Sequence, residues 1–124
     1  MLNMARILVI DDDMLVRMSV EAVLSAKGHT VSLATNGKEG CNVLRTGNYD
    51  LVITDLIMPE MDGIATVRAI REQSSNTKIL AISGGVRNAD GDLLASAVKA
   101  GAIGVLGKPF SNGDLLHAVD CAIA

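Results

Sequence analysis

The sequence predicts an α/β fold, a (βα)5 three-layer sandwich around a five-stranded parallel sheet. Five short apolar runs recur along the 124 residues, helical patterns separate them, and four of the runs are almost continuously apolar. Continuous apolar runs are typical of parallel strands that are covered on both faces. Because strands and helices alternate, right-handed crossovers should place helices on both faces of the sheet. The expected strands are Ile7–Ile10, Val31–Ala34, Leu51–Thr54, Ile79–Ile82 and Ile103–Leu106.

The second run predicts the order of the strands. Apolar and polar residues alternate from Val31 to Thr35, which is typical of a less buried strand at the edge of a sheet. The order 2-1-3-4-5 of flavodoxin-like folds puts the second strand at an edge and makes the first and third strands neighbours. We therefore predict a flavodoxin-like sheet, with residues 1–124 forming a single domain.

Helical patterns fill the intervals between the runs. The first helix should bury Val16, Val20, Val23 and Leu24 and end at Gly28, because glycine commonly terminates a helix. Further helices are expected at Lys38–Arg45, weakened by Gly40, at Asp62–Arg71, at Asp92–Ala100 and after the capping-box pattern Ser111–Asp114.

The composition excludes several classes of function. A net charge of -3 and only two aromatic residues, Tyr49 and Phe110, argue against direct binding of nucleic acid. Apolar runs stay far below the roughly 20 residues of a membrane helix, and the first strand begins too early to leave room for a signal peptide. We therefore expect a cytoplasmic protein without membrane contact.

The cysteines, histidines and methionines show no obvious binding motif. Cys41 and Cys121 are interpreted as small hydrophobic residues on helices, since neither belongs to a CxxC or Cys/His cluster. His29 and His117 are interpreted as surface or boundary residues, and the six methionines as core and packing residues.

Polar residues follow four of the apolar runs. Asp11, Asp12 and Asp13 come after the first run, Asp55 after the third, Ser83 after the fourth and Lys108 after the fifth. Because the carboxyl ends of parallel strands meet at one edge of the sheet, these groups should share a pocket. Each piece alone has an ordinary interpretation as a helix cap, a turn, a loop or a cis X–Pro bond. Their combination carries the prediction.

The pocket has the groups needed for a hard cation and a phosphoryl group. Carboxylates without histidine or cysteine favour Mg²⁺ or Mn²⁺ over zinc. A carboxylate can also attack phosphorus to form an acyl phosphate, and Asp55 is the best candidate because it stands apart from the Asp11–Asp12 pair. The ammonium of Lys108, the hydroxyl of Ser83 and backbone N–H groups after the third and fourth strands could neutralise the incoming charge.

These motifs resemble the receiver domains of bacterial two-component response regulators over essentially the whole chain. The resemblance rests on five short stretches: Val9–Asp13, Asp55–Pro59, Met61–Gly63, Ser83–Gly84 and Lys108–Phe110.

The resemblance implies a role for each site residue. Asp55 would accept a phosphoryl group from a histidine kinase or a histidine phosphotransfer protein. Ser83 and Lys108 would hold that group, and Asp13 would cap the first helix. The metal ligands would be Asp11, largely through water, with Asp12, Asp55 and the backbone carbonyl of Ile57. The backbone groups that bind the phosphoryl oxygens would belong to Leu56, Ile57 and Gly84.

Two positions depart from the family pattern. Receiver domains commonly carry Tyr or Phe three residues before the lysine, where this chain has Val105. A smaller repacking, or movement of the glycine-rich stretch Gly84–Gly91, would then carry the signal. The aliphatic side chain of Ile57 cannot orient a hydrolytic water, so we expect slow autodephosphorylation.

If Ala124 is the natural terminus, we expect a stand-alone receiver, a monomer or weak dimer, whose output is a contact with a downstream protein or onward phosphotransfer. It would not be an enzyme beyond its own phosphorylation and dephosphorylation. An input module of a larger regulator or hybrid kinase is one alternative, and a module that docks partners without phosphorylation is another. An aspartyl-phosphate phosphatase would need an aspartate at Ile57, and a flavodoxin would not place three carboxylates where it binds phosphate.

Overall fold

The computed structural model describes residues 4–56, 63–83 and 95–124. In these residues, five parallel strands form one sheet in the order β2-β1-β3-β4-β5, which confirms the predicted order and the edge position of the second strand. Every strand boundary lies within one residue of its prediction. The strands are β1 (Arg6–Ile10), β2 (Thr30–Ala34), β3 (Leu51–Asp55), β4 (Lys78–Ser83) and β5 (Gly104–Gly107).

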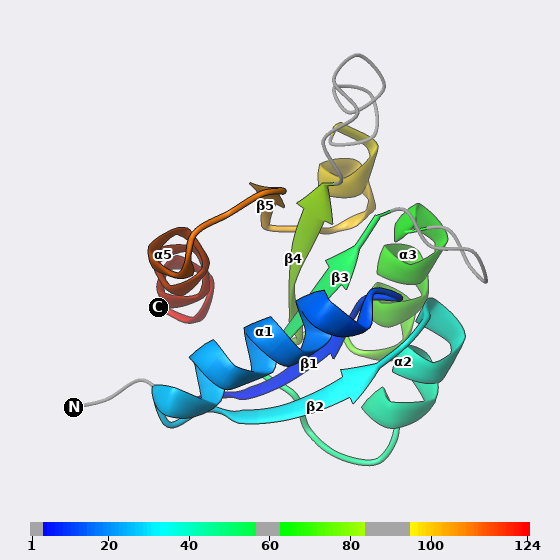
Figure 1. Cartoon of the computed structure of the whole chain (residues 1–124). Coiled ribbons are helices and arrows are strands. Elements are labelled where there is room, and N and C mark those ends of the chain that lie inside the picture. Colours follow the sequence, from blue (N-terminus) through cyan, green and yellow to red (C-terminus); the bar gives the residue numbers. More distant parts are fainter. Residues whose placement is uncertain (1–3, 57–62, 84–94) are drawn as a thin grey trace.

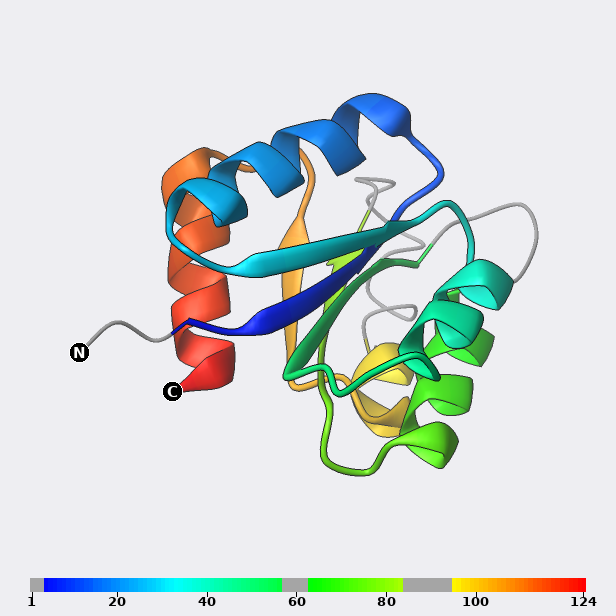
Figure 2. The ribbon, with the colours of Figure 1, turned by 90° about the horizontal axis from the view of Figure 1, so that it is seen from below.

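Helices cover both faces of the sheet (Figures 1 and 2). One face carries α1 (Met14–Ala26) and α5 (Asn112–Ile123), and the other carries α2 (Gly37–Leu44), α3 (Gly63–Gln73) and a helix over residues 95–100. The residues before 95 of the predicted helix Asp92–Ala100 lie outside the described residues. In the described helices, none has the length and apolarity that crossing a membrane would require.

The sheet separates two hydrophobic clusters, as expected for strands that are covered on both sides. Leu8 and Ile10 of β1 pack toward α2 and α3, whereas Ile7 and Val9 pack toward α1 and α5. All four side chains have no solvent exposure. This alternation explains the continuous apolar run, because both sets of strand residues meet apolar partners.

Local hydrogen bonds fix the helix ends that the sequence predicts. The Asp13 carboxylate accepts a hydrogen bond from the Leu15 N–H at 2.9 Å and caps α1, as predicted. Ser111 and Asp114 form the predicted capping box of α5. Gly28 follows α1 with a φ of 94°, a left-handed conformation that favours glycine.

Gly40 in α2 serves the packing of the helix against the sheet. A Cβ atom at this position would collide with the side chain of Ile10 in β1. The missing side chain therefore lets α2 lie close against the sheet.

Three interpretations of single residues need correction. His29 is buried and accepts a hydrogen bond from the Ala5 N–H at Nδ1, 3.0 Å away, so it is not a surface or boundary residue. Met4, Met14 and Met18 are exposed rather than packed in the core. Cys41 is buried in α2 as expected, but Cys121 is exposed on α5. Packing partners decide these positions, and a single residue type does not reveal them.

Candidate functional site

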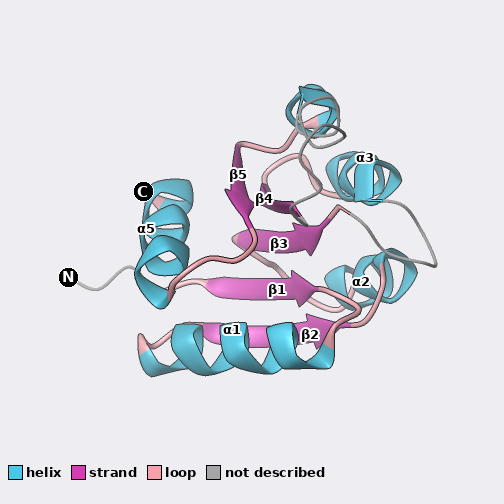
Figure 3. Ribbon diagram, turned by 45° about the horizontal axis from the view of Figure 1, so that its top comes forward, coloured by secondary structure: helices cyan, strands magenta, loops and turns pink. Residues whose placement is uncertain are grey.

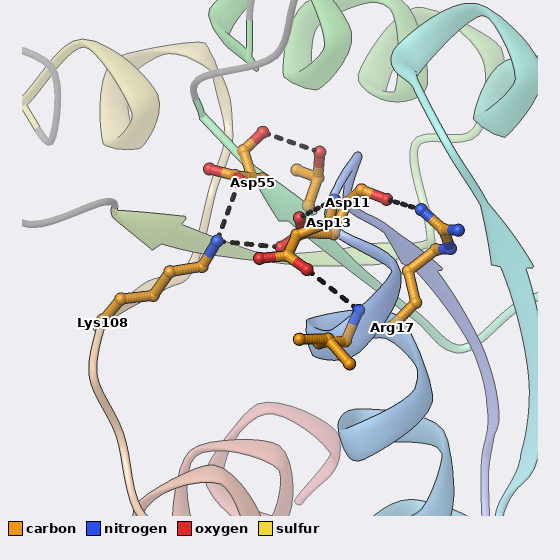
Figure 4. Close-up of polar contacts among 7 residues, drawn as sticks. Asp11, Asp13, Arg17, Asp55 and Lys108 are labelled. Atoms are coloured by element: carbon orange, nitrogen blue, oxygen red, sulfur yellow. Dashed lines mark hydrogen bonds and ion pairs between the residues drawn. The ribbon is translucent and has the colours of Figure 1, made fainter.

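The strands β1, β3 and β5 belong to one sheet (Figure 3), and their carboxyl ends bring Asp11, Asp55 and Lys108 into contact (Figure 4). Asp11 directly follows β1, Asp55 ends β3 and Lys108 directly follows β5. The Lys108 Nζ lies 3.1 Å from Asp11 Oδ2 and 3.1 Å from Asp55 Oδ2. The Lys108–Pro109 peptide bond is cis, one of the alternatives considered for this motif.

Asp12 joins the same acidic cluster from a more exposed position. One carboxylate oxygen from each of Asp11, Asp12 and Asp55 lies within 4.8 Å of the other two. Asp11 and Asp55 are buried, whereas Asp12 is exposed. The structure therefore brings together three of the four carboxylates that the sequence places at this edge, while Asp13 caps α1.

The connection between β1 and α1 is held by a set of local contacts. The Asp11 Oδ1 accepts a hydrogen bond from the Asp13 N–H at 2.9 Å. The Arg17 Nη1 donates to the backbone carbonyl of Asp11 at 2.7 Å (Figure 4). Sequence reasoning missed Arg17, which looks like one more polar residue on an amphipathic helix. Its place one turn into α1, within reach of the preceding connection, is the only signal that could have found it.

Burial and charge shift the proton equilibria of this cluster. Burial raises the pKa of Asp11, and the nearby Asp55 charge raises it further, against the Asp13 N–H and Lys108, which lower it. For Lys108, burial alone would lower the pKa, but its hydrogen bond to Asp55 and its charge attraction to Asp55 and Asp11 outweigh burial and raise it. Lys108 therefore stays positively charged, whereas ionisation of Asp11 is made less favourable.

The donor set fits a hard divalent cation. In the part of the chain that the structure describes, every candidate ligand is a carboxylate oxygen, the ligand type that Mg²⁺ prefers. Among the described residues, the buried Asp11 Oδ2 accepts no hydrogen bond, although it forms an ion pair with Lys108. Three carboxylates that face one ammonium also leave negative charge uncompensated when all are ionised. An Mg²⁺ ion with ligands at about 2.1 Å would satisfy both deficits.

The Leu56 N–H, a predicted phosphoryl-binding group, donates to the Ile82 carbonyl at 3.0 Å and so extends the pairing of β3 with β4. A phosphoryl oxygen would have to share or replace this hydrogen bond, and the role of Leu56 stays a prediction.

The other predicted groups lie beyond or beside the described part of the site. Ile57, Gly84 and the stretch to Gly91 lie outside the described residues. Ser83 ends β4 opposite Gly107, next to Lys108, but its side chain is outside what the structure describes. Val105 pairs with Ala81 and packs, partly buried, against the cluster on the α2–α3 face.

The response regulator receiver domain family matches residues 7–120 of the chain. The chain belongs to this family. The receiver domains of two-component systems are signalling proteins rather than conventional enzymes, which argues against the phosphatase alternative.

The curated relatives are about one-third identical in sequence to this chain. The chain is 36% identical over 111 residues to the response regulator MprA of Mycolicibacterium vanbaalenii, covering 90% of this chain and 47% of that protein. It is 31% identical over 114 residues to the transcriptional regulatory protein DltR of Streptococcus agalactiae, covering 92% and 50%. The chain thus spans about half the length of these relatives.

Solved structures agree with the fold. The chemotaxis protein CheY4 of Vibrio cholerae is 30% identical, with a TM-score of 0.87 and coverage of 96% of this chain and 98% of that chain. The receiver domain of NtrX from Brucella abortus is 27% identical, with a TM-score of 0.88 and coverage of 94% and 97%.

Proposed function

We propose that this receiver domain, residues 1–124, is a phosphoacceptor in which Asp55 takes a phosphoryl group from a phosphohistidine of a kinase or phosphotransfer protein. The observation that carries the proposal is the contact of one ammonium, Lys108, with both Asp55 and Asp11 at 3.1 Å. This arrangement sets an acceptor carboxylate between a fixed positive charge and an acidic metal seat. Membership of the receiver family supports the same assignment.

The reaction is a displacement at phosphorus. A carboxylate oxygen of Asp55 forms an O–P bond while the P–N bond to the donor imidazole breaks, and the imidazole leaves with the bonding electron pair. Lys108 balances negative charge on the transferred group, since its interactions with the Asp55 and Asp11 carboxylates keep its pKa raised despite burial. Asp11, Asp12 and Asp55 would hold Mg²⁺, or Mn²⁺, which supplies further charge neutralisation.

Four further groups complete the proposal on the strength of the family resemblance. The Ile57 carbonyl would be a metal ligand, and the Ile57 and Gly84 N–H groups and the Ser83 hydroxyl would bind phosphoryl oxygens. The phosphorylated domain would act in the cytoplasm through a downstream protein or pass the group onward.

Intact mass after incubation with a small acyl phosphate and Mg²⁺ tests the proposal. We expect one added phosphoryl group on the wild type and none on Asp55→Asn. Asp120→Asn removes an exposed carboxylate on α5 and should be labelled like the wild type. Equal labelling of Asp55→Asn and wild type would refute Asp55 as the acceptor. Failure of both a small donor and a histidine kinase to label the wild type would refute the function itself.

A further inference from the structure

Helix α5 carries a histidine and a cysteine in contact on its exposed surface, away from the acidic pocket. The His117 Nε2 lies 3.6 Å from the Cys121 Sγ, and both residues are exposed. Residues four apart lie on one face of a helix, so both side chains point to the same region of solvent. The sequence interpretation treated them as unclustered because it did not weigh this spacing.

The separation of the two atoms matches the bite of a tetrahedral zinc ion. With Zn–S of about 2.3 Å, Zn–N of about 2.0–2.1 Å and a tetrahedral angle, the sulfur and nitrogen ligands lie about 3.6 Å apart. The observed distance is 3.6 Å. Thiolate and imidazole also select zinc-like ions, whereas the carboxylate pocket selects Mg²⁺. The two sites therefore differ in the class of metal they would take.

The pair is only half of a closed zinc site, which takes four protein ligands. Within the described residues, only one group of three or more side chains could hold a metal ion, the Asp11, Asp12 and Asp55 cluster. The described part of a single chain therefore adds no third ligand to the pair. We propose that His117 and Cys121 bind a zinc-like divalent cation together with the same two residues of a second copy of this chain.

The surface around the pair allows two copies of α5 to approach. Gly113 and Ala124 continue the stripe on either side of His117 and Cys121, and both are exposed. A Cβ at Gly113 would meet no atom nearer than the Ser111 Oγ at 3.7 Å, so space is open there. Small residues permit the interaxial distance of about 8–10 Å at which helices pack. A twofold axis through the metal would present the same residues from both sides.

Charge explains why this contact would need the metal. Helix α5 contains Asp114 and Asp120 and no lysine or arginine, so two copies repel one another. A divalent cation at the interface offsets that repulsion. Binding would convert the Cys121 S–H to a thiolate and release its proton to solvent.

Zinc titration of the full chain tests the proposal. The protein is kept in excess Mg²⁺ with a non-thiol reductant, and the acidic pocket is disabled by Asp12→Asn to remove a competing site. Calorimetry should give one zinc per two chains, and sedimentation should show a dimer that a chelator reverses. Cys121→Ser and His117→Gln should each weaken zinc binding at least tenfold and abolish the dimer. Cys41→Ala, which removes the buried thiol, should behave like the parent.

Three results would overturn it. Zinc binding at one ion per chain without a dimer would remove the shared site. A dimer that persists in both variants, or one that forms without zinc, would place the contact elsewhere. A dimer in oxidised protein that the reductant alone dissolves would indicate a disulfide between two Cys121 residues.

Discussion

Lys108 and a divalent cation would compete for the same carboxylates. The ammonium contacts one oxygen of Asp11 and one of Asp55, and both carboxylates belong to the candidate metal cluster. The lysine side chain is 23% exposed, so part of its attraction is screened by water. The charge that prepares the pocket for a phosphoryl group therefore also limits its affinity for metal.

Lys108→Met should raise the affinity for Mg²⁺ and lower the rate of phosphorylation. Loss of the competing charge should tighten Mg²⁺ binding by about three- to tenfold, equivalent to about 0.7–1.4 kcal/mol. Calorimetric titration measures the first effect, and mass spectrometry of the phosphorylated protein over time measures the second. Lys99→Met removes an exposed lysine and should change neither. Unchanged Mg²⁺ affinity in Lys108→Met would contradict the competition.

Asp11 makes stability depend on pH in a defined direction. Its pKa in the folded state is raised above the ordinary value of 3.8, mainly by burial. The folded state therefore binds a proton more readily than the unfolded state, and Asp11 lowers stability as pH rises from about 3.8 through the folded pKa. Below 3.8 both states are protonated and the cost is gone.

Asp11→Asn should therefore stabilise the metal-free protein at neutral pH. We expect a gain of about 1 kcal/mol in the free energy of unfolding, because the buried charge is removed while the amide oxygen can still accept the Asp13 N–H. The gain should shrink as pH falls toward 3.8. Urea unfolding at several pH values without divalent cations measures it. A gain that grows on acidification would contradict the raised pKa.

At the scale of elements, the start of α3 is packed against the end of β3. The Gly63 N–H donates to the Leu56 carbonyl at 3.0 Å, one residue beyond Asp55. A Cβ at Gly63 would lie 2.6 Å from the Leu56 carbonyl carbon, which cannot move without moving the strand end. This glycine is needed for close approach of two backbones.

Gly63→Ala should cost about 3 kcal/mol of stability, at the upper end for an overpacked site, and should slow phosphorylation of Asp55. Gly113→Ala is the matched control, because its Cβ has room and alanine favours a helix by up to about 1 kcal/mol. Chemical denaturation of both variants measures the difference. Equal stability of the two variants would show that the α3 start can shift freely.

At the scale of the whole molecule, the sheet joins two separately packed layers, and the acidic pocket lies at the edge where connections from both layers meet. Asp11 and Asp12 lead into α1 on one face, while the chain after Asp55 leads toward α3 on the other. A cation held by Asp11, Asp12 and Asp55 would therefore connect strands that belong to both layers.

Mg²⁺ should consequently stabilise the whole fold. At a hundredfold excess over Kd, binding to the folded state alone contributes about 2.7 kcal/mol. Thermal unfolding with and without Mg²⁺ should show a rise in Tm that Asp12→Asn abolishes, with little effect on the metal-free Tm because Asp12 is exposed. Glu72→Gln, another exposed acidic change, should keep the rise. A wild-type Tm that does not change when Mg²⁺ is added would refute the metal site.

The fold and the charged centre of the site were predictable for a physical reason. Continuous apolar runs indicate strands that are buried on both faces. Polar residues at the ends of these runs mark the sheet edge where the carboxyl ends of parallel strands meet, so Asp11, Asp55 and Lys108 could be placed together. Contacts that depend on how far a group extends in the folded structure were not predictable from the sequence. Arg17 binds a carbonyl six residues away, and the Leu56 N–H was engaged by a neighbouring strand.

The strand order explains why the side chain of Lys108 must be long. Because β4 lies between β5 and β3, the side chain must extend over the end of one whole strand to reach Asp55, and further to reach Asp11. The Lys108 side chain thus links the acidic pocket to the connection that leads into α5. A change in the charge of the pocket would change how strongly Lys108 is held there, and the helix that follows this residue along the chain is α5.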